Sequence, residues 1–490
     1  MASLGEIITA VQPETVIGLS DVEIDSVACH PANPAGRNCI FVCMDEYLEY
    51  NRWQTWRTHL EAIEELKPAA LVAPEPVDGL AIPQLVVKHP RKALGRIARL
   101  LSGAPDESLF VTGVTGTNGK TTTTRILSHL FSRLGKPCGC IGTLGVSLPD
   151  HFSIPGTYTT PLSPQVYEDL KQILELGAEA VAMEVSSHGL ALDRVEGICF
   201  DAAILTNVER DHLDFHGTPE AYAEAKRRLF GRVKEQGICI LNRKSPYYEE
   251  FAAASSGTVV GYGECGSAAD LELVDLELGA SNTRFKLSWK GATISLETQL
   301  VGKFQIENTM AAIALLASLG YDLTEIAGAL MDFEPVCGRM ERFDLANGAT
   351  AIVDYAHNPD GLKNVLQNCR LLCEGRLHVV FGCGGDRDKG KRAIMGRLAS
   401  DFADVSWVTS DNPRTEDPEA IIKDIIEGFD KTKDVMTEPD REKAIRKACA
   451  AADPNDLVLI AGKGHEDYQI IGYTKHHFSD QEVLKELGAY

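Results

Sequence analysis

One ten-residue run constrains the fold of this chain more than any other: Gly-Val-Thr-Gly-Thr-Asn-Gly-Lys-Thr-Thr at residues 113–122. It follows the apolar segment Phe110–Val114 and precedes apolar residues at helical spacing, Ile126, Leu127, Leu130, Phe131 and Leu134. A strand, a glycine-rich turn and a helix predict a phosphate-binding loop, because backbone N–H groups and the helix N-terminus attract phosphate. We expect Lys120 to bridge the β and γ phosphates and Thr121 to bind Mg²⁺. The upstream glycine, Gly113, lies one position earlier than in the general phosphate-loop pattern. The alternative to a phosphate-binding loop is a glycine-rich turn with a purely structural role.

The segments around this run alternate between strand and helix patterns, which predicts an α/β protein. The alternation extends from residue 109 to about 330, and four more strand–helix units contain AIVDYAH, LHVVFGCGG, VSWVTSDNP and LVLIAGKGHED. It indicates mostly parallel sheets covered by helices on both faces. A chain of 490 residues is also too long for one core, since domains usually hold about 100–200 residues. We predict domains at residues 1–88, 89–335 and 336–490.

The charge and the cysteine content exclude several classes of protein. A formal net charge of −22 argues against a non-specific nucleic-acid binder, because no general basic field attracts phosphate. The 13 cysteines lack a metal-binding spacing, so free buried thiols in a reducing compartment are expected. Residues 1–19 lack the basic start of a signal peptide, and no apolar run approaches the roughly 20 residues that cross a bilayer. We expect a cytoplasmic monomer that acts on small molecules.

Three further segments carry groups that suit a nucleotide site. Glu184 lies at the end of the strand pattern Ala180–Val185, and ligands collect at the carboxyl ends of strands in open α/β sheets. The run NVERDHLDFHG at residues 207–217 is dense in oxygen and imidazole ligands, although a solvated loop is the alternative. Lys226 follows on a helix in the run Lys-Arg-Arg, for which spacing alone favours an exposed basic face.

Eight segments resemble, in order, motifs of the Mur ligase family. They are GVTGTNGKTT, EVSSH, NVERDHLDFHG with its following AEAKRRLF, GRMERFD, DYAHNPD, GCGGDRDKGKR, SDNPRTEDP and GKGHEDYQ, within residues 109 to about 480. The resemblance implies three domains: an N-terminal substrate-binding domain, a central P-loop ATPase-like domain on a parallel sheet, and a C-terminal Rossmann-like, doubly wound domain. Within the family the chain looks like the tripeptide synthetases, which join an amino acid to UDP-N-acetylmuramoyl-L-alanyl-D-glutamate in peptidoglycan synthesis.

The resemblance implies an ATP-dependent acid–amino-acid ligase. In this family ATP phosphorylates the glutamyl carboxylate to an acyl phosphate, the amine attacks, and amide and phosphate form. Phosphoryl transfer between two anions needs charge neutralisation and in-line positioning more than covalent help. The implied cofactors are Mg²⁺ and CO₂, the latter as a lysine carbamate (N6-carboxylysine) at Lys226, which replaces the basic-face interpretation. The implied catalytic residues are Lys120, Glu184, His212 and Lys226, and the implied metal ligands are Thr121, Glu184, His212 and the Lys226 carbamate.

The family also implies contacts for the two nucleotide substrates. For ATP they are Gly116, Thr117, Asn118, Gly119, Lys120, Thr121, Thr122, Asn308, Arg339 and Asp354. For the UDP-muramoyl dipeptide they are Ile24, Ser26, Thr159, Thr160, Ser186 and Arg194. The chain departs from the family pattern at three of the neighbouring positions: Gln305 replaces an asparagine, Leu192 a glutamine and Val27 an arginine.

The amino-acid pocket is expected in loops that follow strands of the third block. Its implied residues are Arg387, Asp411, Asn412, Pro413, Arg414, Gly462 and Glu466. Parallel topology brings such loops to one edge of a sheet. Two arginines with two carboxylates suit a zwitterion that bears an extra carboxylate, because guanidinium groups bind carboxylates bidentately. The DNPR run resembles that of enzymes adding meso-diaminopimelate, and a surface salt-bridge cluster is the alternative.

Three other functions stay open at this point. A lysine-adding variant would differ at the arginine of DNPR. A folate-polyglutamating ligase shares the phosphate loop and the folding plan, although DNPR followed by GKGHED argues against it. An inactive nucleotide-binding relative is the third, because the stretch Asp45–Arg52 lacks the glycine and histidine common in the family.

Overall fold

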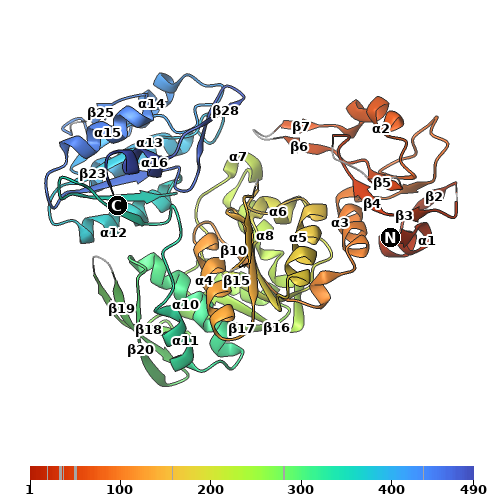
Figure 1. The fold of residues 1–490 in the computed structure, drawn as a ribbon, viewed down its shortest axis with the longest axis horizontal. Helices are drawn as coiled ribbons and strands as arrows, with labels where there is room; N and C mark the ends of the chain where they lie inside the picture. The colour runs from red at the N-terminus through yellow and green to blue at the C-terminus, as the bar shows by residue number, and fades with distance from the viewer. Residues whose placement is uncertain are drawn as a thin grey trace.

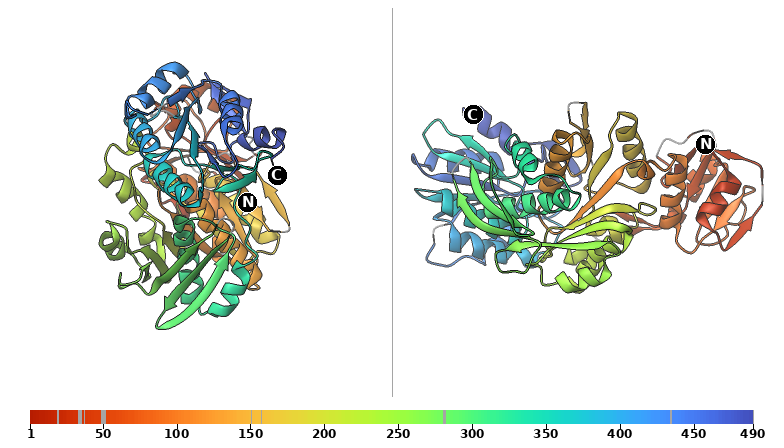
Figure 2. Two further views of the ribbon diagram at one scale, coloured as in Figure 1. Left: turned by 90° about the vertical axis from the view of Figure 1, so that its left-hand side faces the viewer. Right: turned by 90° about the horizontal axis from the view of Figure 1, so that it is seen from below.

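The computed structural model describes residues 1–18, 20–32, 36, 38–48, 52–149, 151–156, 158–279, 282–433 and 435–489. Three large sheets follow one another along the chain and lie in a row, with the N-terminal part (red) at one end and the C-terminal part (blue) at the other (Figure 1). The right-hand view of Figure 2 shows the same elongated arrangement, with the two termini on opposite parts of the molecule.

The N-terminal part is a five-stranded sheet in the order β2-β9-β8-β5-β4, parallel except for β2. Alternate residues of its strands pack on opposite faces, against α1 and α3 on one side and against η1 and α2 on the other. Its elements are β1 Ala2–Ser3, α1 Leu4–Val11, β2 Thr15–Ile17, β3 Glu23–Ile24, β4 Ser26–Ala28, β5 Cys39–Val42, β6 Glu46–Leu48, β7 Arg52–Gln54, η1 Trp56–His59, α2 Leu60–Leu66, β8 Ala70–Ala73, β9 Gln84–Val86 and α3 Pro90–Leu101.

Helix α3 joins the first two parts. Ala93, Leu94 and Ile97 pack in the N-terminal core, whereas Ala98 packs in the central core. A Cβ at Gly95 would lie 2.8 Å from the Cβ of Glu196, so the helix approaches the central part closely. The domain boundary between residues 88 and 89 stays a prediction, since α3 contributes to both cores.

The central part is an eleven-stranded sheet in the order β13-β12-β11-β14-β10-β15-β16-β17-β18-β19-β20, parallel from β11 to β18 and antiparallel at both ends. Helices α4, α10 and α11 cover one face, and α5, α8 and α9 cover the other. Its elements are η2 Pro105–Glu107, β10 Phe110–Thr115, α4 Lys120–Arg133, β11 Cys138–Gly142, β12 Gly145–Leu148, β13 Phe152–Ile154, α5 Ser163–Glu175, β14 Ala180–Glu184, α6 Ser187–Ala191, β15 Phe200–Leu205, α7 Leu213–His216, α8 Pro219–Arg227, η3 Phe230–Arg232, β16 Val233–Asn242, α9 Tyr248–Ala254, β17 Thr258–Glu264, β18 Leu271–Leu278, β19 Thr283–Trp289, β20 Ala292–Thr298, α10 Lys303–Ser318 and α11 Leu323–Leu330.

The C-terminal part is a six-stranded sheet in the order β21-β22-β26-β23-β24-β25, parallel except for β21. Helices α12, α13 and α14 cover one face and α15 and α16 the other, which confirms the predicted doubly wound α/β class. Its elements are β21 Glu341–Asp344, β22 Thr350–Asp354, α12 Pro359–Leu372, β23 Leu377–Phe381, α13 Gly390–Phe402, β24 Val405–Val408, α14 Pro418–Ile426, β25 Val435–Thr437, α15 Arg441–Ala451, β26 Leu457–Ala461, β27 Tyr468–Ile471, β28 Thr474–His477 and α16 Asp480–Glu486.

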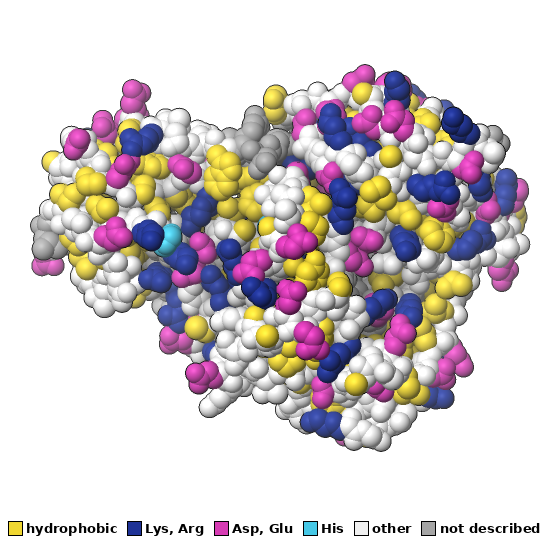
Figure 3. Space-filling model, turned by 180° about the vertical axis from the view of Figure 1, so that it is seen from behind, with side chains coloured by type: hydrophobic (Ala, Val, Ile, Leu, Met, Phe, Trp, Pro, Cys, Tyr) yellow, Lys and Arg dark blue, Asp and Glu magenta, His cyan; other side chains and the backbone are white. Residues whose placement is uncertain are grey.

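The surface carries charged side chains of both signs. On the face that Figure 3 shows, acidic and basic side chains are interspersed, with hydrophobic side chains between them. Within the part of the chain that the structure describes, no helix combines the length and the apolar character needed to cross a membrane. All 13 cysteines are free thiols, as the sequence predicts, but the expectation that they are buried is wrong for Cys199, Cys265 and Cys337, which are exposed.

Candidate functional site

The phosphate-binding loop lies between β10 and α4 and is closed by two glycines. Gly116 has a φ of +153°, and a Cβ there would lie 1.8 Å from the Thr206 hydroxyl. Gly119, the N-cap of α4, has a φ of +86°, and a Cβ there would lie 2.2 Å from Oδ1 of Asn308. Gly113 instead lies inside β10, where a Cβ would meet an aromatic ring at 2.9 Å. Its early position therefore reflects strand packing and not the loop.

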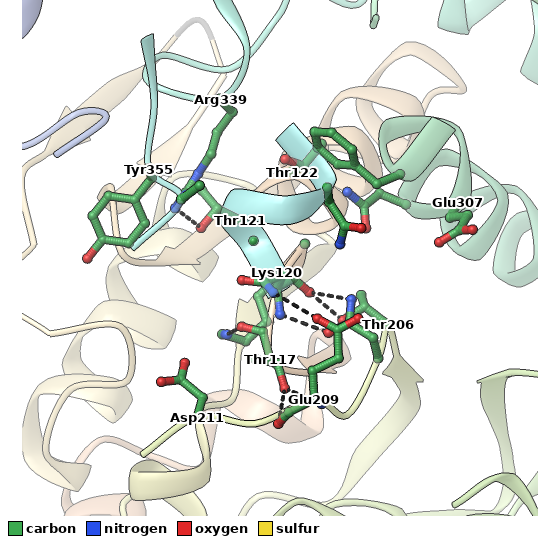
Figure 4. A pocket seen from close by; sticks show the side chains of 18 of the residues that line it. Thr117, Lys120, Thr121, Thr122, Thr206, Glu209, Asp211, Glu307, Arg339 and Tyr355 are labelled. Atoms are coloured by element: carbon green, nitrogen blue, oxygen red, sulfur yellow. Dashed lines mark hydrogen bonds between the residues drawn. The ribbon is translucent and has the colours of Figure 1, made fainter. Parts of the chain in front are cut away.

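The loop opens into a cavity of about 540 Å³ between the central and C-terminal parts. Figure 4 shows that Arg339 approaches the start of α4 from the opposite side to Thr206 and Glu209. Arg339 donates from Nη2 to the Thr121 hydroxyl at 3.2 Å, although 218 positions separate the two residues. The cavity expected to hold the nucleotide is thus built from both parts of the chain.

Lys120 lies across the loop. Its Nζ donates to the carbonyl oxygens of Gly116 and Thr117, both at 2.9 Å. Burial lowers the pKa of Lys120, and the carboxylates of Glu184 and Asp211 oppose this shift. Because both current acceptors are neutral carbonyls, an incoming phosphate oxygen would be the stronger acceptor for this ammonium.

Glu184 supplies a fixed carboxylate at the carboxyl end of β14, as the sequence predicts. It is buried and accepts from the backbone N–H of Thr143 at 2.8 Å and from the Thr143 hydroxyl at 3.1 Å. A Cβ at Gly142 would lie 2.3 Å from Oε1 of Glu184, so the glycine leaves room for the carboxylate. Glu184 lines the same cavity as Lys120 and Thr121.

His212 lines this cavity from the N-cap of α7, with a φ of +51°. Its ring is 4.7 Å from that of His188, and its Nε2 is 3.7 Å from a carboxylate oxygen of Asp211. Desolvation lowers the pKa of His212 against the opposing effect of Asp211, and burial lowers the pKa of His188 to about 2. Both imidazoles are therefore neutral at pH 7, the form that binds metals.

Lys226 is 1% exposed, so the basic-face interpretation of its spacing is wrong. Its Nζ donates to the Gly116 carbonyl at 2.8 Å and lies 4.3 Å from the centre of the Tyr222 ring. Burial, followed by the neighbouring Lys120 ammonium, lowers the pKa of Lys226 well below its usual value. The amine lies behind the loop and carries no close carboxylate partner among the contacts described for it.

The donor set fits a divalent cation at the front of the loop. The Thr121 hydroxyl, the Glu184 carboxylate and the His212 imidazole all face one cavity. Oxygen ligands suit Mg²⁺, and imidazole extends the set to other divalent ions. An ammonium at Lys226 would repel a cation, whereas a carbamate there would support one.

The residues expected to bind the nucleoside also line the cavity. Asn308 donates from Nδ2 to Oε1 of Gln305 at 3.4 Å, so the residue that replaces the family's asparagine contacts Asn308 directly. Both carboxylate oxygens of Asp354 accept backbone N–H groups, from Met340 and Ala356, at 2.8 Å. Burial raises the pKa of Asp354, which lines the cavity with its remaining surface.

Four residues expected at the muramoyl substrate gather beside Glu184. The Thr160 hydroxyl donates to the Glu184 carbonyl at 2.9 Å, and Arg194 donates to the Thr160 carbonyl at 2.9 Å. The hydroxyls of Thr160 and Ser186 are 3.1 Å apart, and the Thr159 hydroxyl is 3.0 Å from that of Thr143. Leu192, at the position of the family's glutamine, is buried.

The residues expected at the uridine end belong to the separate N-terminal part. The Ser26 hydroxyl donates to Asp25 at 2.8 Å and accepts from the Gly36 N–H at 2.8 Å, so it closes its own loop. Ile24 is 0% exposed and packs in the N-terminal core, so its side chain presents no surface to a ligand, and its role at the uridine end stays a prediction. Within Asp45–Arg52, residues 49–51 lie outside the described residues.

The residues expected at the amino-acid pocket do meet at one edge of the C-terminal sheet. Asn412 donates from Nδ2 to Glu466 at 3.1 Å, and a Cβ at Gly462 would lie 2.6 Å from an Asp411 carboxylate oxygen. A Cβ at Gly384 would lie 2.7 Å from Nη1 of Arg414 and 3.7 Å from Cγ of Arg387, so both arginines flank that glycine. Buried Pro413 joins Asn412 to Arg414.

Family models match most of the chain. The Mur ligase middle domain matches residues 114–316, and the Mur ligase, glutamate ligase domain matches residues 338–464. The chain belongs to the Mur ligase family. One relative of this Mur ligase is the UDP-N-acetylmuramoyl-L-alanyl-D-glutamate–2,6-diaminopimelate ligase of Geobacillus kaustophilus, 42% identical over 85% of this chain and 86% of the relative. The protein of that name from Parasynechococcus marenigrum is 39% identical over 99% and 98%.

Solved structures of Mur ligases share the architecture. A structure of UDP-N-acetylmuramoyl-L-alanyl-D-glutamate–2,6-diaminopimelate ligase superposes with a TM-score of 0.68 and 30% identity, over 99% of this chain and 98% of that chain. Folylpolyglutamate synthase of Mycobacterium tuberculosis, complexed with ADP and AMPPCP, has a TM-score of 0.64 and 19% identity over 76% and 92%. At that identity the second likeness concerns the fold alone.

Sequence reasoning missed one residue that lies among those expected at the amino-acid pocket of this Mur ligase. Lys463 is fully buried and donates to Asn412 at 3.2 Å, to Glu466 at 3.2 Å and to the Tyr468 carbonyl at 2.7 Å. Its ammonium lowers the pKa of Asp411 against the effect of burial. The signal that could have identified Lys463 is its position between two glycines in GKGHED, where no long neighbouring side chain competes for the same space.

Glu416, in the run SDNPRTEDP, anchors the neighbouring loop of this Mur ligase. It accepts from buried Arg392 at 2.8 and 3.0 Å and from the backbone N–H of Asp386 at 2.5 Å. The hydrogen bond from Arg392, ahead of other effects, lowers the pKa of Glu416 from 4.5 to about 2. The ion pair therefore stabilises the fold above pH 4.5, and this contribution is lost as the pH falls from 4.5 towards 2.

Replacement Glu416→Gln is expected to lower the free energy of unfolding at pH 7 by about 2 kcal/mol. The pKa shift corresponds to about 3 kcal/mol, and solvent screening near the surface reduces it. Urea unfolding at pH 7 and pH 3 measures the effect, and the difference from wild type should shrink at pH 3. Glu419→Gln, at an exposed position of α14, is the control. An equal difference at both pH values would contradict the assignment of this stability to the Glu416 charge.

Proposed function

We propose that this Mur ligase joins meso-diaminopimelate to UDP-N-acetylmuramoyl-L-alanyl-D-glutamate at the expense of ATP, as a step of peptidoglycan synthesis. The observation that carries the proposal is the pairing of a phosphate-loop cavity with a mixed-charge pocket on the adjoining C-terminal sheet, where Arg387 and Arg414 flank Gly384. The names of relatives about 40% identical over most of the chain support the same choice.

The first chemical step transfers the γ-phosphoryl group of ATP to the glutamyl carboxylate and releases ADP. Lys120 would leave the carbonyls of Gly116 and Thr117 and bind the phosphates. Thr121, Glu184 and His212 would hold Mg²⁺, which supplies charge neutralisation between the two reacting anions. Arg339, beside Thr121, would add positive charge when the C-terminal part is closed.

Lys226 would carry a carbamate. A neutral amine adds to CO₂ and loses a proton, and the lowered pKa of Lys226 provides the neutral amine. The product is an anion behind the loop, which would offset the charge of Lys120 and orient the groups that hold the metal.

The second step is attack of the amino acid on the acyl phosphate. Asp411 and Glu466 would bind the ammonium group that does not react, while Arg387 and Arg414 would bind the carboxylates. The other amine attacks in its neutral form: its nitrogen bonds to the acyl carbon, the acyl carbon–oxygen bond to phosphate breaks, and phosphate leaves while the nitrogen loses a proton to solvent. Dependence on ATP and the free cysteines support a cytoplasmic location, and the proposal treats the protein as a monomer.

Phosphate release tests the proposal. Purified protein is given ATP, Mg²⁺ and UDP-muramoyl dipeptide with meso-diaminopimelate, L-lysine or glutamate, and folate with glutamate in a separate reaction. We expect release with diaminopimelate. Release with lysine instead would identify the lysine-adding variant, stimulation by folate the polyglutamating ligase, and no release an inactive relative.

Replacement Arg414→Ala is expected to remove the preference for diaminopimelate over lysine, a loss of about 10–100-fold in the ratio of kcat/KM values. Lysine lacks the distal carboxylate that the guanidinium would bind, and a hydrogen bond to a charged group is worth about 1.5–3 kcal/mol. Arg414→Lys, which keeps the charge but not the fork, should lose part of the preference. Unchanged selectivity in Arg414→Ala would show that the pocket is assigned wrongly.

A further inference from the structure

Asn358 sits where the C-terminal part meets the phosphate loop. It is the N-cap of α12, and its Oδ1 accepts from the Gly361 N–H at 2.8 Å. The side chain is 1% exposed. Because the cap uses only the oxygen of the carboxamide, both N–H bonds of Nδ2 remain for other partners.

Those two bonds reach two different segments of the central part. Nδ2 of Asn358 donates to Oδ1 of Asn118 at 3.3 Å and to Oδ2 of Asp211 at 3.2 Å. Asn118 belongs to the phosphate loop, where its backbone N–H is held by Asn207 at 2.9 Å. Asp211 directly precedes His212 and lines the same cavity. One buried amide thus bridges the loop and the segment that carries His212.

Other contacts described between these two parts reach one segment each, among them the ion pair of Arg210 with Asp388 at 3.6 Å, beside Asp211. Arg339 contacts Thr121 of α4, and Asn368 accepts from the Lys303 N–H at the start of α10 at 3.0 Å. Nδ2 of Asn358 can donate both hydrogen bonds only when α12 lies against both segments. The bridge therefore depends on closure of the C-terminal part.

We propose that Asn358 is a positioning residue of the ligase reaction, which fixes Asp211 and the adjoining His212 relative to the phosphate loop when the C-terminal part closes. The inference rests on the proposed function for its kinetic readout. It assigns to one side chain two separable tasks, a helix cap through the oxygen and a bridge through the nitrogen.

Two substitutions separate these tasks. Asn358→Ser and Asn358→Asp keep a good N-cap, since serine and aspartate are preferred there, but neither can donate both bonds. Asn358→Ser is expected to lower kcat about tenfold with an unchanged melting temperature. Asn358→Asp should lower kcat further, because its carboxylate would face Asp211. Small-angle scattering with bound ADP should show a less compact molecule for both variants than for wild type.

A matched control is Asn347→Ser, which loses amide bonds to the carbonyls of Cys449 and Ala452 within the C-terminal part. It should lower stability without changing compaction on ADP binding. Wild-type kcat and compaction in both Asn358 variants would overturn the proposal, and so would an activity loss that only follows a fall in melting temperature. If wild type itself lacks ligase activity, the proposed function fails, while the scattering comparison still decides whether Asn358 holds the closed form.

Discussion

Replacement of Lys120 by methionine is expected to lower ligase turnover by about 10²–10³-fold, the usual loss when a single group that stabilises the transition-state charge is removed. The Lys120 ammonium stands at the mouth of the phosphate loop, and its present acceptors are two carbonyl oxygens of that loop. Methionine keeps the length and the apolar stem but places no charge beside the transferred phosphoryl group.

The assay is release of phosphate under saturating substrates, together with ATP binding by calorimetry. Lys136→Met is the matched control: it removes an ammonium just beyond the opposite end of α4, where Nζ lies 4.6 Å from the centre of the Phe110 ring. We expect nearly full turnover in that variant. Equal turnover in both variants would remove Lys120 from the catalytic set.

Replacement Lys226→Arg should lower turnover by a similar factor, about 10²–10³-fold. A guanidinium stays protonated and cannot add to CO₂, so the variant would bury a permanent cation where the proposal requires an anion. Lys226 is prepared for that chemistry, since burial and the Lys120 charge already favour its neutral amine.

Activity measured after removal of CO₂, and again after addition of bicarbonate, tests directly whether Lys226 is carbamylated. Wild-type activity should fall and recover, and ¹³C-bicarbonate should give a carbamate resonance that Lys226→Arg lacks. Arg227→Lys, on the exposed side of α8 in an ion pair with Glu224, serves as the control and should respond like wild type. A variant at position 226 that still responds to bicarbonate would refute the modification.

Local patterns predicted the strand, loop and helix geometry around the expected nucleotide site. The apolar strand, the glycines and the amphipathic helix gave the phosphate loop, and Glu184 was expected at a strand end because parallel topology fixes where such ends lie. The glycine at position 113 was harder to interpret from spacing. A side chain there would collide with an aromatic ring from a strand far along the chain, a contact that local spacing does not show.

Features that depend on contacts between distant segments could not be predicted. Spacing alone predicted an exposed side chain for Lys226, because the burial of Lys226 depends on its contacts with the phosphate loop and with Tyr222. Ile24 was expected at a ligand, yet core packing leaves it no surface. The bridge from Asn358 likewise depends on how two sheets approach each other, which no local pattern encodes.

The shared helix α3 has a mechanical consequence. Its residues are divided between two hydrophobic cores, and Arg96 also pairs with Glu196 of the central part at 3.6 Å. Hinge motion at that joint would expose apolar side chains on both sides to water, so it is costly. Hinge motion is therefore expected at the other connection, between α11 and β21. The N-terminal and central parts should move together as one rigid body relative to the C-terminal part while nucleotides enter and leave.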